Sequence, residues 1–224
     1  MCAILGFLRL WAHECLRVFH DRLIDDQDRS WFKDLIASTV TDQFNFDFNK
    51  IKGDHTNIIY GNFSDPKAAV KVYTELGDRA VLQKVMGGYL DDYNQMTTTP
   101  MSLVLFESAI EHIARISRII NQPYGNALLV GVGGSGRKSL TTMAVHIAEF
   151  SRFTIEITKS YGLSDWREDI KTMMNRAGVQ NKPTVFVIDD TQIVRESFLE
   201  DINGILNTGE VANLFNSEET GDPS

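Results

Sequence analysis

The stretch Leu128-Leu-Val-Gly-Val-Gly-Gly-Ser-Gly-Arg-Lys-Ser-Leu140 decides the fold predicted for this chain. An apolar run over 126–130 leads into four closely spaced glycines, and a helix-compatible run follows over 138–150. This order of strand, glycine loop and helix is that of the Walker A phosphate loop, in which backbone N–H groups surround an anion. The helix adds its partially positive N-terminus. The stretch therefore predicts a site for the phosphates of a nucleotide.

The loop departs from the Walker A pattern after its last glycine. Arg137 stands where the pattern has Lys, and Lys138 stands where it has Ser or Thr. Arg137 can still contact phosphate through its planar guanidinium, whereas Lys138 cannot ligate Mg²⁺ because an ammonium has no lone pair. Ser139 follows one residue late, about 100° further round a helix. We therefore predict phosphate binding with weak or absent magnesium-dependent hydrolysis. The predicted nucleotide-binding residues are Gly131, Gly133, Gly134, Ser135, Gly136, Arg137, Lys138 and Ser139.

A second motif, Thr184-Val-Phe-Val-Ile-Asp-Asp190, resembles Walker B. A short apolar run rich in β-branched residues is typical of a buried parallel strand, and here it ends in two acids. Asp189 is the predicted magnesium ligand, and Asp190 is predicted to polarise the attacking water, although it is one methylene shorter than the usual Glu. The alternative is that the two acids cap the next helix or pair with Arg137 and Lys138. That alternative is compatible with nucleotide binding and opposes only catalysis.

The composition fits a globular protein of one or two domains. The chain has 224 residues, of which 43% are hydrophobic and 23% charged. A formal net charge of −8 argues against nucleic acid as a partner. No run reaches the roughly 18 apolar residues of a membrane span. Two cysteines, Cys2 and Cys15, make no disulfide framework, which favours a reducing compartment.

The polar run over 94–100 separates two regions of different pattern. Residues 1–95 are predicted to be mostly helical and contain no catalytic constellation. Residues 96–215 alternate helices with strands, which predicts an α/β fold with a parallel sheet and right-handed crossovers. Three strands are expected where a P-loop NTPase core has about five, so this core is expected to be incomplete, and residues 216–224 are expected to be a disordered tail. The predicted helices cover 3–24, 31–40, 65–76, 79–93, 103–120, 138–150, 164–178 and 196–207, and the predicted strands cover 126–130, 153–157 and 184–188.

Several long strings resemble the motor region of axonemal dynein heavy chains. Gly125-Asn-Ala-Leu-Leu-Val-Gly-Val-Gly-Gly-Ser-Gly136, Asp190-Thr-Gln-Ile-Val-Arg-Glu-Ser-Phe-Leu-Glu-Asp-Ile-Asn203 and Gly209-Glu-Val-Ala-Asn-Leu-Phe215 are similar to the fourth AAA+ module of that family. Leu10-Trp-Ala-His-Glu-Cys-Leu-Arg-Val-Phe-His-Asp-Arg-Leu23 is similar to the helical lid of the third module. Pro100-Met-Ser-Leu-Val-Leu-Phe106 looks like the lead-in that flanks the adenine.

The resemblance implies a ring of six AAA+ modules that drives a microtubule motor in the cytoplasm, cytoskeleton and ciliary axoneme. It implies that residues 1–95 are a lid-type domain and residues 96–215 an AAA+ core with a regulatory site for ATP or ADP. The implied partners are the remaining AAA+ modules and the dynein intermediate and light chains, with microtubules reached only through parts outside this sequence. The sensor asparagine, the arginine finger and the stalk also lie outside it, so this chain alone is not expected to be a motor.

The resemblance also bears on two further positions, Lys138 and Asp189. Lys138 lies where many relatives carry an uncharged polar residue, and Asp189 lies where axonemal relatives often carry Thr. These differences suggest that Lys138 pairs with Asp189 in place of a metal. A purely structural module without exchangeable nucleotide is the alternative function, while an unrelated P-loop enzyme such as a kinase is disfavoured because the sequence shows no substrate-pocket constellation.

Overall fold

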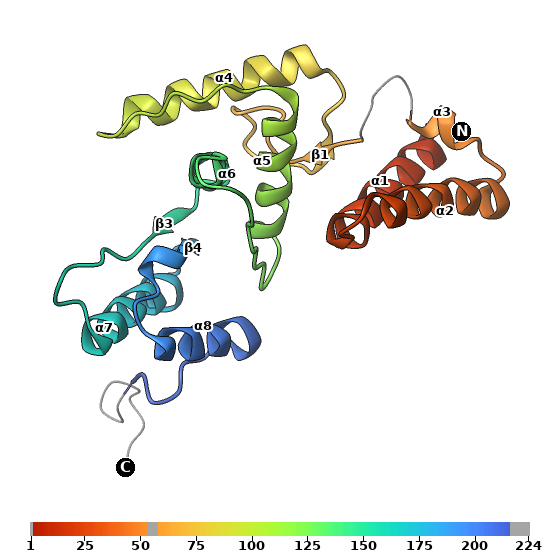
Figure 1. The fold of residues 1–224 in the computed structure, drawn as a ribbon. Helices are drawn as coiled ribbons and strands as arrows, with labels where there is room; N and C mark the ends of the chain where they lie inside the picture. The colour runs from red at the N-terminus through yellow and green to blue at the C-terminus, as the bar shows by residue number, and fades with distance from the viewer. Residues whose placement is uncertain (1, 53–57, 216–224) are drawn as a thin grey trace. The chain divides into compact units, whose positions relative to one another are not determined.

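The computed structural model describes residues 2–52 and 58–215, and the chain divides into two compact units, residues 1–118 and 119–224. The first unit is mostly helical, and the second combines helices with a small parallel sheet (Figure 1). This confirms the predicted mixture of a helical N-terminal part and an α/β part. The predicted domain limits at residues 95 and 215 stay predictions, and the predicted disordered tail lies outside the described residues. No helix in the described ranges is long and apolar enough to cross a membrane.

The first unit has two long helices near its N-terminus, and their apolar faces form its core. Leu8 and Ala12 of one helix pack with Ile36 and Val40 of the other, and all four are buried. The second helix was predicted over 31–40 but begins earlier, at Asp26, because the Asp25 carboxylate accepts a hydrogen bond from the Asp28 amide at 2.8 Å as an N-cap. The elements are α1 (Cys2–Val18), η1 (His20–Arg22), α2 (Asp26–Phe44), α3 (Phe48–Lys52), β1 (Tyr60–Gly61), β2 (Thr74–Glu75), α4 (Arg79–Met96) and α5 (Glu107–Ile120), whose last two residues belong to the second unit.

The predicted helix over 65–76 is wrong. The Asp65 carboxylate accepts a hydrogen bond from the Lys67 amide at 2.9 Å, which forms a local turn that competes with a helix. Further along, Glu75 lies in β2, which pairs antiparallel with β1, and its carboxylate forms an ion pair with Arg9 of α1. These long-range contacts outweigh the helix propensity of the segment.

The predicted helix over 103–120 begins four residues too early, because the segment 101–106 is extended and held on α4. The Asn94 side chain accepts a hydrogen bond from the Met101 amide at 2.8 Å and donates one to the Met101 carbonyl at 3.0 Å. Gln83 donates to the Leu105 carbonyl at 3.2 Å. Two amide side chains thus satisfy backbone groups that a helix would otherwise pair internally.

Buried and half-buried polar side chains of α1 form hydrogen bonds and an ion pair with other segments of the first unit. His13 is 2% exposed; its Nδ1 lies 2.8 Å from the Ile58 carbonyl, and its Nε2 lies 3.0 Å from the Tyr73 hydroxyl. The neighbouring Glu14 forms an ion pair with Arg118 near the end of α5. Both ring nitrogens of His13 are therefore engaged in hydrogen bonds within the first unit.

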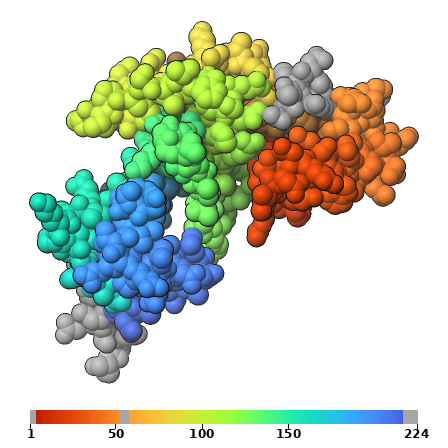
Figure 2. Space-filling view, viewed as in Figure 1, coloured from red at the N-terminus to blue at the C-terminus, as the bar shows by residue number. Residues whose placement is uncertain are grey.

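The core of the second unit surrounds Trp166, which has no exposed surface. Its ring stacks on Phe198 with centroids 4.4 Å apart and planes 8° from parallel. Phe153 and Phe186, from two parallel strands, belong to the same cluster. Figure 2 shows the outer surface of the segments that enclose this core, coloured cyan to blue. The elements are α6 (Arg137–Ile147), β3 (Ser151–Phe153), α7 (Leu163–Met174), η2 (Asn175–Val179), β4 (Thr184–Phe186), η3 (Asp190–Gln192) and α8 (Glu196–Thr208).

The predicted helices over 79–93, 138–150, 164–178 and 196–207 are confirmed as α4, α6, α7 with η2, and α8. The helix predicted over 3–24 is confirmed as far as Val18, and a 3-10 turn follows. The limits predicted for the strand over 153–157 are wrong, because β3 covers Ser151–Phe153 and overlaps the prediction at Phe153.

Gly125 closes the turn that follows α5, and we expect Gly125→Ala to lower the free energy of unfolding. A Cβ at this position would lie 1.8 Å from the Ile119 carbonyl oxygen, so the backbone has to move. The expected loss is about 1–3 kcal/mol, as for other overpacked sites, and urea unfolding measures it. Gly178→Ala is the matched control, because a Cβ there meets nothing within 4 Å. Equal stability of the two variants would contradict the expected clash.

Candidate functional site

The predicted phosphate loop connects an extended segment to α6. Gly134 and Gly136 have φ angles of 77° and 80°, a conformation that disfavours residues with a Cβ. Gly136 is the N-cap of α6, and the helix buries Leu140 and Met143 while its first turn faces the loop. The amide of Ser135 donates to the Val132 carbonyl at 3.3 Å, which forms a tight turn. The sequence pattern thus gives the expected glycine loop and helix.

The strand predicted before the loop is wrong. Residues 126–130 are extended without strand pairing, and the side chains of Leu128 and Val130 are 89% and 85% exposed. A strand needs a neighbour that accepts and donates along its edge. Within the described residues, the parallel ladder runs between β3 and β4, from Ser151–Thr184 to Phe153–Phe186, and does not include this segment. The apolar run is therefore compatible with a strand, but it has no partner in the part of the chain described.

Arg137, the residue at the Walker A lysine position, turns back onto its own loop. Its Nη1 lies 3.4 Å from the Leu129 carbonyl oxygen, and its Nη2 lies 3.2 Å from the Val132 carbonyl oxygen. The two distances lie at and beyond the upper limit for N–H···O hydrogen bonds, and both contacts are exposed to solvent, so they are weak. The guanidinium is consequently held beside the loop by weak contacts, and its predicted role in phosphate binding stays a prediction.

Lys138 forms an ion pair with Asp189, and this confirms the contact predicted from the two unusual positions. The pair joins the first turn of α6 to the end of the segment that continues β4. The Lys138 side chain is 71% exposed and that of Asp189 is 24% exposed. The Lys138 ammonium, together with the Thr191 hydroxyl, lowers the pKa of the Asp189 carboxyl below its ordinary value. The Asp189 carboxylate is therefore ionised at neutral pH.

Asp189 is also an N-cap, which the sequence reading gave as an alternative role. Its Oδ1 accepts from the Thr191 amide at 3.0 Å and from the Thr191 hydroxyl. Gln192 completes a capping box, because its Oε1 accepts from the Asp189 amide at 2.8 Å. Gln192 also donates to the Ile155 carbonyl at 2.6 Å, and so it connects the ends of β3 and β4. Both alternatives for Asp189, capping and pairing, are realised.

Sequence reasoning missed the roles of Thr191 and Gln192. The signal was present as an acidic residue followed three positions later by Gln, which is the spacing of a capping box. Asp190, next to Asp189, is exposed at the start of η3, and Ser139, next to Lys138, is half-buried in α6. Their predicted roles, in positioning water and in binding phosphate, stay predictions.

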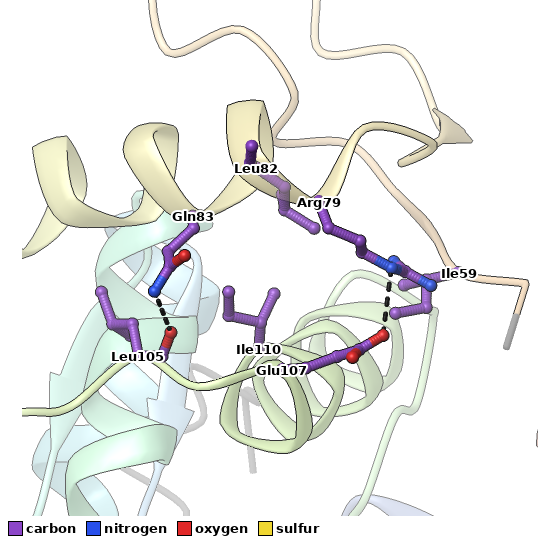
Figure 3. A pocket seen from close by; sticks show the side chains of 8 residues that line it. Ile59, Arg79, Leu82, Gln83, Leu105, Glu107 and Ile110 are labelled. Carbon is purple, nitrogen blue, oxygen red and sulfur yellow. Dashed lines mark hydrogen bonds and ion pairs between the residues drawn. The ribbon is translucent and has the colours of Figure 1, made fainter. Parts of the chain in front are cut away.

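A pocket of about 290 Å³ lies in the first unit (Figure 3). Leu82, Leu105 and Ile110 supply apolar wall, while Arg79 and Glu107 form an ion pair of 3.2 Å at its side. Leu105 belongs to the segment that the resemblance places beside an adenine. That role stays a prediction.

Comparison with known proteins gives a consistent assignment. The family model described as the P-loop containing dynein motor region D4 matches residues 101–222. "Dynein axonemal heavy chain 1" of Mus musculus is 49% identical over 212 residues, which is 95% of this chain and 5% of that protein. "Dynein axonemal heavy chain 3" of Mus musculus is 45% identical over 96% of this chain and 6% of its own length. "Dynein-1-beta heavy chain, flagellar inner arm I1 complex" of Chlamydomonas reinhardtii is 45% identical over 96% of this chain and 5% of its own length.

The chain thus spans about one-twentieth of the curated relatives it matches. The family model covers more than half of the chain, including the glycine loop, the ion pair and the capping box. It agrees with the fold, because a glycine loop that opens into a helix and a parallel strand that ends in acids are the elements of an AAA-type P-loop domain. The chain therefore belongs to the family of the P-loop containing dynein motor region D4 and is a homologue of axonemal dynein heavy chains.

Proposed function

We propose that this chain is a nucleotide-binding, regulatory segment of an axonemal dynein motor. In this proposal, residues 1–95 are the helical lid of the third AAA+ module and residues 96–215 the core of the fourth. The observation that carries it is the glycine loop: two glycines at positive φ lead directly into α6, and the first turn of α6 contacts the acidic end of a parallel strand segment. Such a loop directs N–H groups at an anion and lies beside the carboxylates that act on nucleotides in P-loop proteins.

The proposed ligand is ATP or ADP. The loop amides and Arg137 hold its phosphates, and Arg137 does so after leaving the carbonyls of Leu129 and Val132. In this proposal Asp190 positions the attacking water, so any hydrolysis depends on it. Since Asp189 is engaged by Lys138 and Thr191, hydrolysis is weak or absent and the site is regulatory.

The proposed setting follows from the relatives, whose names place them in axonemes and flagella. The proposed partners are the other AAA+ modules of a dynein heavy chain and, through the whole assembly, intermediate and light chains. Microtubules are reached through parts outside this chain. The proposed location is the cytoskeleton of a ciliary or flagellar axoneme.

A second candidate function is a structural module that maintains the geometry of the ring without exchangeable nucleotide. The observation in its favour is Arg137, whose hydrogen bonds to Leu129 and Val132 close the loop on itself. The two functions differ in one measurable property, which is nucleotide affinity.

Nucleotide binding is tested by calorimetric titration of the full chain with ADP and with ATP. We expect Arg137→Ala to weaken binding about 10- to 100-fold, because a charge-assisted hydrogen bond contributes about 1.5–3 kcal/mol. The matched control is Lys182→Ala, which removes an exposed cation at the opposite end of β4 from Asp189 and should leave affinity unchanged. Circular dichroism verifies that each variant is folded.

The outcomes separate the two functions. Binding that falls with Arg137→Ala and not with Lys182→Ala supports the nucleotide site. Equal loss in both variants would mean that general charge, and not the loop, attracts the ligand. An absence of binding to the unaltered chain would favour the structural module.

A further inference from the structure

The ion pair between Lys138 and Asp189 lies where a P-loop protein of this family is expected to hold Mg²⁺. A magnesium ion there needs oxygen ligands from the residue after the Walker A lysine and from the Walker B acid. The side chains at these two positions contact each other instead. We propose that the Lys138 ammonium replaces the metal, so that the site binds a nucleoside diphosphate without magnesium. This inference rests on the proposed nucleotide site and specifies its ligand.

Both oxygens of the Asp189 carboxylate are already engaged. Oδ2 contacts the Lys138 ammonium, and Oδ1 accepts from the amide and the hydroxyl of Thr191. The backbone of Asp189 is fixed as well, because its amide donates to Gln192. Magnesium requires near-ideal octahedral geometry and gives up its water reluctantly, so it competes poorly for a carboxylate held in this way.

The first turn of α6 offers no replacement ligand at the required place. Lys138 is a donor only. The next hydroxyl, that of Ser139, is about 100° further round the helix and is half-buried. In the described ranges, no three His, Cys, Asp or Glu residues are grouped so that they could hold a metal. The donor set therefore does not fit Mg²⁺.

The charge of the site favours a diphosphate over a triphosphate. Arg137 and Lys138 balance the carboxylates of Asp189 and Asp190. Without a divalent cation, the additional negative charge of a third phosphate is not neutralised by any further positive group, and the carboxylates of Asp189 and Asp190 repel it. ADP carries less negative charge than ATP. We therefore expect the unaltered chain to bind ADP several-fold more tightly than ATP when EDTA is present.

The test compares magnesium with EDTA in calorimetric titrations of the full chain with ADP. For the unaltered protein, the dissociation constants in the two conditions should agree within about twofold. Lys138→Ser frees Asp189 and supplies a hydroxyl ligand, so magnesium should tighten its ADP binding at least tenfold. Lys138→Arg is the matched control, because it keeps the charge and should remain insensitive to magnesium. Since Lys138 is 71% exposed, these changes leave the core intact.

Electron paramagnetic resonance of Mn²⁺ provides a second readout that does not depend on affinity for nucleotide alone. With ADP present in excess, Lys138→Ser should retain protein-bound Mn²⁺ and the unaltered chain should not. Magnesium-dependent tightening or protein-bound Mn²⁺ in the unaltered chain would overturn the inference while leaving the nucleotide site in place. An absence of ADP binding in every protein and condition would overturn the proposed function and this inference with it.

Discussion

Replacing Trp166 by Ala is expected to lower the free energy of unfolding of the second unit by about 3–5 kcal/mol, the range for truncation of a large buried aromatic residue. Trp166 has no exposed surface and stacks on Phe198 over a centroid distance of 4.4 Å. Its indole Nε1 donates to the Asp201 carboxylate at 2.8 Å, so truncation leaves both a cavity and a carboxylate without this donor. The measurement is urea unfolding followed by far-ultraviolet circular dichroism.

Two further substitutions distinguish the loss of the buried ring from the loss of the hydrogen bond and from the effect of replacing an exposed tryptophan. Trp166→Phe keeps an aromatic ring against Phe198 and loses the hydrogen bond to Asp201, so a smaller loss of about 1–2 kcal/mol is expected. Trp31→Ala is the control for an exposed tryptophan, because Trp31 is 60% exposed, and a change within about 0.5 kcal/mol is expected. A loss for Trp166→Ala no larger than for Trp31→Ala would contradict this view of the core.

Acidification is expected to destabilise the first unit through His13. Burial, with smaller effects from the nearby charges of Arg17 and Arg118, lowers the pKa of His13 from 6.5 to about 4, although the Ile58 carbonyl and Glu14 act in the opposite direction. The His13 imidazole is thus protonated near pH 6.5 in the unfolded chain, whereas in the folded chain it is protonated only near pH 4. The contribution of neutral His13 to the free energy of unfolding is fully present above pH 6.5 and is lost as the pH falls toward 4. The expected loss is about 3 kcal/mol.

The measurement is urea unfolding at pH 7 and pH 4.5 for three proteins. The unaltered chain should lose stability between these values, in part through its carboxylates. His13→Gln should lose clearly less, because glutamine does not titrate. His112→Gln changes an exposed histidine of α5 and should behave like the unaltered chain. The same pH dependence in all three proteins would show that His13 is not the responsible group.

The sequence was most informative where local rules decide the structure. The glycine spacing of the loop and the apolar periodicity of α6, α7 and α8 specify those elements without distant contacts. The acids that follow the apolar run at 184–188 lie at the end of a parallel strand, as their pattern indicates. The pair of Lys138 with Asp189 was predictable because Lys138 departs from the Walker A pattern by adding a positive charge, which is complementary to the Walker B-like acid Asp189.

The secondary-structure predictions were wrong where contacts with residues far away in the sequence determine the conformation of a segment. The segment 65–76 has a helical pattern, yet Glu75 is drawn into β2 by Arg9, which precedes it by 66 residues. Similarly, the extended segment 101–106 depends on the side-chain amides of Gln83 and Asn94. The apolar run over 126–130 reads as a buried strand, but burial depends on a neighbouring strand that a local pattern cannot supply. Such contacts leave no periodic signal in the segment they alter.

The ion pair between Lys138 and Asp189 also has a consequence for descent. In the proposed metal-free site, substitutions at Lys138 and at Asp189 have different effects on magnesium binding. A substitution of Lys138 by Ser creates a magnesium ligand and releases the carboxylate of Asp189 in one step. A substitution of Asp189 by Thr leaves the ammonium in place, so the metal remains excluded and a second mutation is required. The order in which these two positions change therefore determines whether a lineage that starts from this chain passes through a metal-binding intermediate.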